Sequence, residues 1–158
     1  MNERRVVIPA PARTGLTRTT GARTRLIDPW RISLWAVQLL LAAVFGDDGF
    51  VKAMHPVEAL TETFNWPGQV PEGLVRFIGG SELAAALGLV LPTATRILPY
   101  LTPFAALCLT LLMWAAFVFH TMRGEWQMLP VNVALGLLAA FVAWGRLGKA
   151  PVDSRFED

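Results

Sequence analysis

Ionisable and amide side chains interrupt the apolar stretches of this sequence, and they are the residues that could do chemistry. The candidates for catalysis are Asp47, Asp48, Glu82 and His120. The candidates for substrate contact are Lys52, Asn132, Trp114 and Phe45. Carboxyl and imidazole groups serve as general acids and bases. In such apolar surroundings they predict proton transfer on an apolar substrate, as in isomerisation, epoxide opening or cyclisation.

The spacing of Asp48, Lys52 and His55 places the three on one face of a helix, because residues four and seven apart lie above one another. Asp48 can therefore pair with Lys52, whereas Asp47 points about 100° away and does not share that partner easily. Two adjacent carboxyl groups near Glu82 are not all expected to be ionised, because burial and like charges favour the neutral acid. A neutral acid beside a charged one is the arrangement that acid–base catalysis needs.

The elements that position these residues are four apolar segments, which we expect at about residues 32–54, 73–91, 98–120 and 128–144. Of the 158 residues, 54% are hydrophobic and only 16% are charged, far from the composition of a soluble domain. A helix of about 20 apolar residues crosses the hydrocarbon of a bilayer. The connections are short, so the predicted fold is all-α: an antiparallel integral membrane four-helix bundle spanning residues 29–147.

The distribution of basic residues predicts the orientation of this bundle. Seven of the fourteen Lys and Arg residues lie in the first 31 positions, Arg96 lies in the second connection, and three more follow the last segment. The first connection holds Glu58, Glu62 and Glu72 instead. By the positive-inside rule, both ends of the chain are expected in the cytoplasm. Residues 1–28 are then a disordered basic tail, and residues 148–158 a C-terminal cytoplasmic tail.

The polar residues fall at similar depths in this arrangement. At 1.5 Å per residue, Asp48 lies about 9 Å and Glu82 about 14 Å below the outer helix ends. His120 lies at the outer end of its segment and Asn132 about one turn inside the next. Because ionisable groups inside a membrane are costly and normally face the bundle interior, we expect a polar pocket in the outer half. The competing interpretation is structural: each group fixes helix register or reaches the headgroups.

Two further patterns bear on packing. Pro56 can begin a short helix that presents Leu60 and Phe64 on one face and is followed by Trp66 and Pro67. This connection is expected to lie on the outer membrane surface and cover what is beneath it. Gly80, Ala84 and Gly88 recur every four residues, a spacing that lets membrane helices approach closely.

Several function classes are disfavoured. Cys108 is the single cysteine, so the chain holds neither an internal disulfide nor a Cys-x-x-Cys redox pair. Two histidines without a third strong ligand do not predict a metal site or a haem, and no phosphate-binding glycine loop or nucleophile elbow occurs. No nucleic-acid partner and no bound cofactor are predicted, although a quinone is one candidate ligand. Four short helices without an inverted repeat also disfavour a transporter.

Four segments of the sequence resemble the DoxX-like family of small bacterial membrane proteins. They are Gly49-Phe50-Val51-Lys52, Phe77-Ile78-Gly79-Gly80-Ser81-Glu82-Leu83, Leu87-Gly88-Leu89-Val90-Leu91-Pro92 and Val118-Phe119-His120. The resemblance covers about residues 30–146. It implies a four-helix bundle in the bacterial inner membrane. Relatives have been linked to quinone-coupled sulfur oxidation and to membrane-associated oxidoreductase complexes. Gly46-Asp47-Asp48 departs from the family pattern, which is apolar or small just before Gly-x-x-Lys.

These patterns leave two functions open. The first is a membrane enzyme or enzyme subunit that acts on a lipophilic small molecule, by acid–base chemistry or by quinone-linked redox chemistry. The second is a non-catalytic membrane anchor or assembly subunit for a soluble oxidoreductase. Membrane lipid and a lipophilic small molecule are the expected partners, with a soluble oxidoreductase or further copies of the chain as candidates.

Overall fold

The computed structural model describes residues 28–156, and within this range it is all-helical. The predicted basic tail falls almost entirely outside the described residues. The long helices are α1 (Pro29–Met54), α3 (Glu72–Thr95), α4 (Leu101–Met122) and α5 (Leu129–Trp144). The short elements are α2 (Val57–Thr63), η1 (Pro67–Gln69), η2 (Trp126–Met128) and the π-helical turn η3 (Gly145–Lys149). Counting α5 with η2 and η3, the described range holds four helices that are long and apolar enough to cross a membrane.

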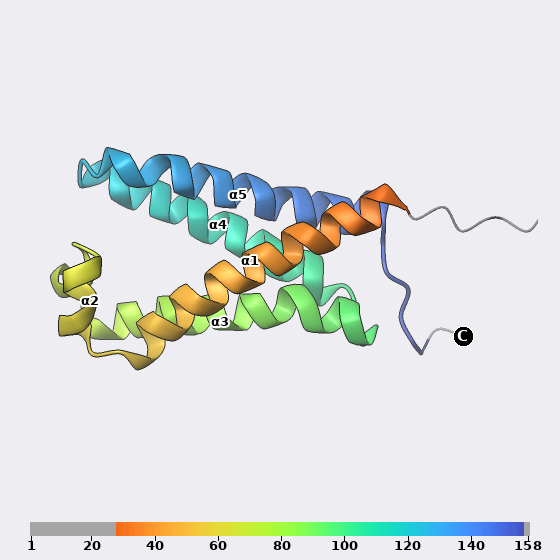
Figure 1. Cartoon of the computed structure of the whole chain (residues 1–158), viewed down its shortest axis with the longest axis horizontal. Coiled ribbons are helices and arrows are strands. Elements are labelled where there is room, and N and C mark those ends of the chain that lie inside the picture. Colours follow the sequence, from red (N-terminus) through yellow and green to blue (C-terminus); the bar gives the residue numbers. More distant parts are fainter. Residues whose placement is uncertain (1–27, 157–158) are drawn as a thin grey trace, which may run out of the picture.

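The long helices form an antiparallel bundle in which α1 packs along α3 and α4 packs along α5 (Figure 1). Contacts between α3 and α4, and between α1 and α5, close the ring. Figure 1 also shows that α2 lies across one end of the bundle, which we call the α2 end. The described chain begins and finishes at the opposite end, which we call the terminal end. The predicted all-α membrane bundle is confirmed.

The hydrophobic residues divide between a small core and the outer surface. Leu41, Phe45, Leu89, Leu109 and Val142 are buried at the centre, where all four long helices meet. Large hydrophobic side chains are nevertheless exposed on the outside of every long helix. Lipid tails are as apolar as leucine, so this outer surface is stable in a bilayer. The membrane-spanning helices thus contact lipid directly.

Helix α3 continues three residues past Pro92, where the sequence predicted its end. A proline inside a helix lacks the N–H that would bond the carbonyl four residues earlier, which here belongs to Gly88. The Thr102 hydroxyl of α4 donates to that carbonyl at 3.1 Å and also accepts from Thr93 at 2.9 Å. A neighbouring helix therefore satisfies the freed group, as membrane proteins allow. The helix ends instead where Arg96 takes a left-handed conformation.

Helices α1 and α3 approach each other closely, backbone to backbone, at Gly49 and Gly79. A Cβ on Gly49 would lie 2.8 Å from the Gly79 carbonyl oxygen, and one on Gly79 would lie 2.8 Å from the Ala53 nitrogen. In the predicted small-residue series, Gly88 does approach another helix, at Ala105, but Gly80 faces open space. The predicted series therefore includes a close contact between α3 and α4 at Gly88, while the close contact between α1 and α3 uses Gly79, which lies outside the series.

Gly49→Ala is expected to destabilise the bundle by about 1–3 kcal/mol, because the added methyl group meets backbone atoms that cannot move independently. Gly80→Ala is the matched control: it adds the same group on α3 where nothing lies within 4 Å. Unfolding by denaturing detergent in mixed micelles compares the two variants. Equal stability of Gly49→Ala and Gly80→Ala would show that the α1–α3 contact is not close-packed.

The segment between α1 and α3 has the predicted short helix. Helix α2 follows directly after Pro56, and its Leu60 is buried. The chain then passes through η1 and enters α3 after Pro71. At the terminal end, the chain continues beyond α5 through η3 and an extended stretch, where the backbone N–H of Arg155 donates to the Arg96 carbonyl at 2.9 Å.

Candidate functional site

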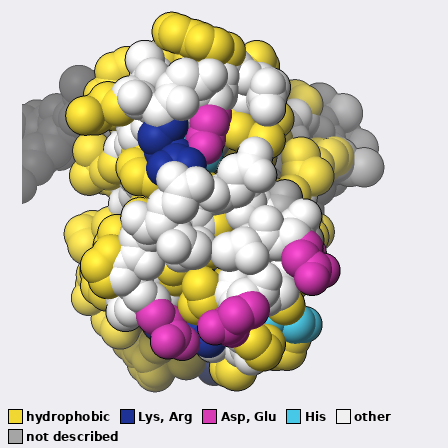
Figure 2. Space-filling model, turned by 90° about the vertical axis from the view of Figure 1, so that its left-hand side faces the viewer, with side chains coloured by type: hydrophobic (Ala, Val, Ile, Leu, Met, Phe, Trp, Pro, Cys, Tyr) yellow, Lys and Arg dark blue, Asp and Glu magenta, His cyan; other side chains and the backbone are white. Residues whose placement is uncertain are grey.

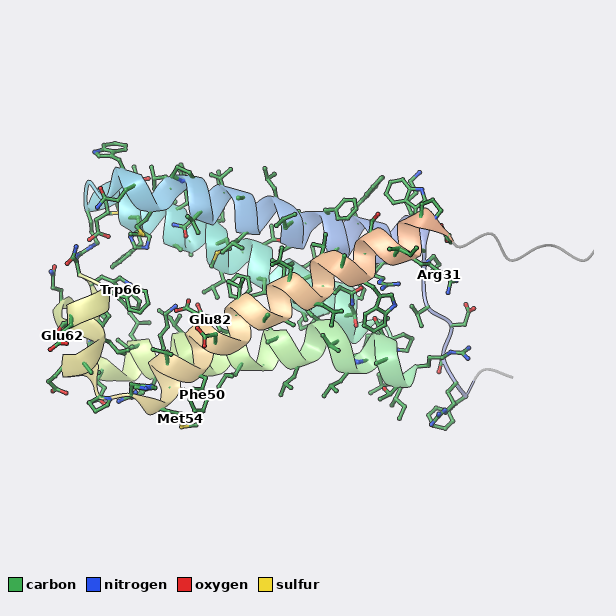
Figure 3. All side chains as sticks on the ribbon, in the orientation of Figure 1. Arg31, Phe50, Met54, Glu62, Trp66 and Glu82 are labelled. Carbon is green, nitrogen blue, oxygen red and sulfur yellow. The ribbon has the colours of Figure 1, made fainter. Side chains whose placement is uncertain are left out.

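A cavity of about 520 Å³ lies in the half of the bundle nearest the α2 end. The facing sides of α1, α3, α4 and α5 form its walls, and the connection carrying Phe64, Asn65 and Trp66 contributes to its lining. Most of the lining is apolar. The ionisable and amide side chains on it include Asp48, Lys52, Glu82, His120, Glu125 and Asn132. Figure 3 shows Trp66 extending toward the region between the two helix pairs where Glu82 lies, whereas Phe50 and Met54 point away from it.

Lys52 is the centre of a buried ionic group on the cavity wall. Its Nζ donates to Asp48 Oδ2 at 2.6 Å and to the two Glu82 carboxyl oxygens at 2.8 and 3.1 Å. Glu82 is 1% exposed and Lys52 6%, while Asp48 is partly exposed. The Trp66 ring lies 5.8 Å from Nζ, within cation–π range. Close packing at Gly49 and Gly79 brings these side chains of α1 and α3 together.

Arg76 holds the end of α1 in place beside this group. Its Nη1 donates to the carbonyl oxygens of Lys52 at 2.8 Å and His55 at 2.6 Å. The last carbonyls of a helix have no partner within the helix, so this guanidinium satisfies one of them, at Lys52, together with the carbonyl of His55 directly after the helix. Glu72, one turn earlier on α3, accepts from Arg76 at 2.9 Å and orients it. Arg76 is therefore a positioning residue for Lys52.

Asn132 contributes an unused hydrogen-bond donor to the cavity. Its amide Nδ2 is buried and has no hydrogen-bond partner among the described residues. Leaving a buried donor unpaired costs about 1–3 kcal/mol, so such a group calls for an explanation. An acceptor on a bound molecule would satisfy it, which makes Asn132 the clearest indication of a ligand.

His120 belongs to a polar network at the turn between α4 and α5. Its Nδ1 lies 2.5 Å from Glu125 Oε2, while Arg123 Nε donates to Glu125 Oε1 at 2.9 Å. The hydrogen bond from Arg123, and a further one from His120, keep the pKa of Glu125 below its usual range. Glu125 therefore stays ionised until the pH falls below the usual pKa of a carboxyl group. Its hydrogen bonds as a carboxylate are lost only at such a pH. Arg123 Nη1 also reaches Gln69 of η1 at 2.8 Å.

The hydrogen bond between Arg123 and Gln69 joins the turn after α4 to η1, and these two segments lie at the α2 end of the bundle. Figure 2 looks onto that end: charged side chains of both signs gather on it, while hydrophobic side chains lie mainly around the sides. The cavity therefore has a polar end and mainly apolar walls, which would suit a molecule with a polar head and an apolar body.

The structure brings six of the eight sequence-predicted residues to one cavity: Phe45, Asp48, Lys52, Glu82, His120 and Asn132. Asp47 and Trp114 are not on its lining. Asp47 is exposed on α1, one residue away from the face that carries Asp48. Trp114 is 64% exposed and stacks on Phe117 at the outside of α4. Whether any of these residues binds or reacts stays a prediction.

Three roles in the site were not predicted from the sequence: Trp66 as a wall of the cavity, although its segment was expected to cover what lies beneath, Arg76 as a cap for α1, and Glu125 as the partner of His120. Of these, only Glu125 had a local signal, because it follows His120 by five residues across a tight turn. The others depend on contacts between distant segments. Within residues 28–156, no three His, Cys, Asp or Glu side chains are grouped to hold a metal ion.

Four apolar membrane-length helices with hydrophobic outer surfaces define a multi-pass integral membrane protein. The family model of the DoxX-like family matches residues 36–142, which run from the second turn of α1 to near the end of α5, and the chain belongs to this family. The resemblance inferred from the sequence motifs is thereby confirmed. Comparisons with curated proteins and with solved structures gave no match.

Proposed function

We propose that the protein is a membrane enzyme, or a subunit of one, that transfers protons to and from a lipophilic small molecule bound in the cavity. One observation carries this proposal: the buried Asp48–Lys52–Glu82 group and the unpartnered amide of Asn132 line the same cavity. The first can exchange protons, and the second can bind an oxygen atom of the substrate.

The cavity supports a substrate with an oxygen-bearing head. Its volume of about 520 Å³ lies within the range of small-molecule sites. Apolar side chains such as Phe45, Ile78 and Leu112 suit a ring or chain, and Asn132 suits a carbonyl or ether oxygen. A quinone or an oxygenated polyprenyl compound has this chemistry and would enter from the bilayer.

Proton transfer follows from the charge balance of the ionic group. Two carboxyl groups share the single ammonium of Lys52, so one proton on either of them leaves the group neutral. An ionised carboxyl can take a proton from a carbon next to a substrate carbonyl, and the released electron pair moves toward the carbonyl oxygen. The Asn132 N–H would stabilise the charge on that oxygen. When a carbon–carbon double bond lies next to the deprotonated carbon, the electron pair spreads into a dienolate, and returning the proton at the far end of that double bond completes an isomerisation with no oxidant consumed.

We propose the same orientation that the charge pattern predicts, with the terminal end in the cytoplasm of a bacterial cell and the α2 end outside. Arg96, Arg146, Lys149 and Arg155 gather at or near the terminal end, which supports this orientation. Reporter fusions after residue 150 should then be active only with a cytoplasmic reporter, and fusions at residue 65 only with an external one. The reverse pattern would overturn the orientation.

The proposed activity can be tested without knowing the substrate. Purified full-length protein in micelles is incubated in D₂O with the apolar extract of its host cells and, separately, with a quinone and a polyprenyl ketone. Mass spectrometry then follows deuterium in each compound. We expect one compound to gain deuterium faster than in micelles without protein. Binding without any gain in deuterium would remove the enzyme function and favour a non-catalytic subunit of an oxidoreductase.

A further inference from the structure

A second cavity, of about 620 Å³, lies at the terminal end, far from the site described above. Its lining comes from the start of α1, the end of α3, the turn η3 and the extended stretch after it. Three arginines line it: Arg31, Arg96 and Arg146. Among the described residues, Asp153 is the single acid on the lining. The cavity therefore carries a surplus of positive charge.

Arg146 is the residue that most requires a negatively charged partner. It is 5% exposed, yet its guanidinium donates only to neutral oxygens: Nε to Gln38 Oε1 at 2.7 Å, Nη2 to the same oxygen, and Nη1 to the Ala150 carbonyl at 3.4 Å. None of the acids that the structure describes forms an ion pair with it. A buried charge without a counter-charge is costly.

The residues around Arg146 hold its guanidinium at the cavity, but none of its contacts with the described residues supplies a negative charge. Gln38 is fully buried, and its own amide donates to the Leu89 carbonyl, which fixes the oxygen that accepts from Arg146. The Trp35 ring packs 5.6 Å from the guanidinium carbon. Arg31, four residues before Trp35, lies on the same side of α1. The guanidinium is therefore held rigidly at the wall of a basic cavity.

The other two arginines are accessible. Arg31 is exposed, and its one ion pair with a described residue is a long contact with Asp28, at 3.6 Å. Arg96 is exposed, and its Nε donates to the backbone carbonyl of Asp153 at 3.3 Å, which leaves the guanidinium without a carboxylate partner among the described residues. Arginine presents several N–H groups in a plane that matches the oxygens of a phosphate.

We infer that this cavity binds a phosphate-bearing anion, with Arg146 at its inner wall and Arg31 and Arg96 at its opening. The position of the cavity favours the headgroup of an anionic phospholipid as the source of the phosphate. Tryptophans prefer the headgroup level of a bilayer, and Trp30, Trp35 and Trp144 all lie at this end of the bundle. Basic pockets between membrane helices are known to hold such headgroups.

The binding test uses purified full-length protein freed of lipid in neutral micelles. Its thermal unfolding is followed while phosphatidylglycerol, phosphatidylcholine or inorganic phosphate is added at constant ionic strength. A saturable rise of the unfolding temperature with phosphatidylglycerol but not phosphatidylcholine identifies the lipid headgroup. A rise with inorganic phosphate at millimolar concentration identifies a soluble phosphate. If none of the three has an effect beyond that of chloride, the inference is overturned.

Variants locate the binding. Each of Arg31→Gln and Arg96→Gln is expected to weaken the apparent affinity about fivefold. Lys149→Gln is the matched control, because Lys149 is an exposed cation at the same end that does not line the cavity. Asp153→Asn removes the lining acid and should tighten binding, so the inference stays testable if an arginine variant fails to fold. Equal weakening by Lys149→Gln would show general attraction to the surface and overturn the site.

Discussion

Asp48→Asn is expected to lower the rate of deuterium incorporation into the substrate by about 10²- to 10⁴-fold, the usual contribution of a general acid or base. The asparagine keeps an oxygen that can accept the hydrogen bond from Lys52, so the ionic group keeps its shape. It cannot take up a proton. Glu82→Gln is expected to have an effect of the same size for the same reason, and the double variant should be no more active than the weaker single one.

Asp47→Asn is the matched control for this prediction. Asp47 is the neighbour of Asp48 in the sequence, but it is exposed and lies off the cavity lining, so the same chemical change should leave the rate unchanged. Losing one hydrogen bond within a membrane costs only about 0.6 kcal/mol on average, so a structural role predicts small effects at either position. Normal rates in Asp48→Asn, Glu82→Gln and their double variant would eliminate the acid–base proposal.

The sequence predicted the features that depend on local periodicity. Four apolar stretches of membrane length became four long helices, and the spacing of Asp48 and Lys52 correctly placed both on one face of α1. Depth along each helix also predicted that Glu82, His120 and Asn132 would lie at similar levels. Depth and helical face follow from counting residues, and these five lining residues could therefore be grouped without a structure.

The features that the sequence did not reveal depend on pairs of distant residues. The sequence predicted that α3 would end near Pro92. It could not show that the Thr102 hydroxyl, on another helix, supplies the hydrogen bond that Pro92 cannot make. The Gly49–Gly79 contact was missed, because only one of several glycines on α3 faces α1. From the sequence, Arg146 was counted only among the basic residues that predict orientation. Its burial was not predicted, because it depends on Gln38, 108 residues earlier.

Lys52→Met is expected to destabilise the protein by about 3–5 kcal/mol, because it leaves the carboxyl groups of Glu82 and Asp48 in the bundle without their counter-charge. Unfolding by denaturing detergent measures this loss, and Lys149→Met, at an exposed position, should show little change.

The double variant Lys52→Met/Glu82→Gln tests the cause of that loss. Glu82 is the buried partner, with a side chain 2% exposed, whereas Asp48 is 31% exposed and can retain part of its hydration. Making Glu82 neutral should therefore restore most of the stability that Lys52→Met removes. Glu82→Gln alone should be no more stable than the unsubstituted protein. If the double variant is as unstable as Lys52→Met, the lysine stabilises the bundle through packing against Trp66 and its neighbours, and the carboxyl groups are not held by its charge.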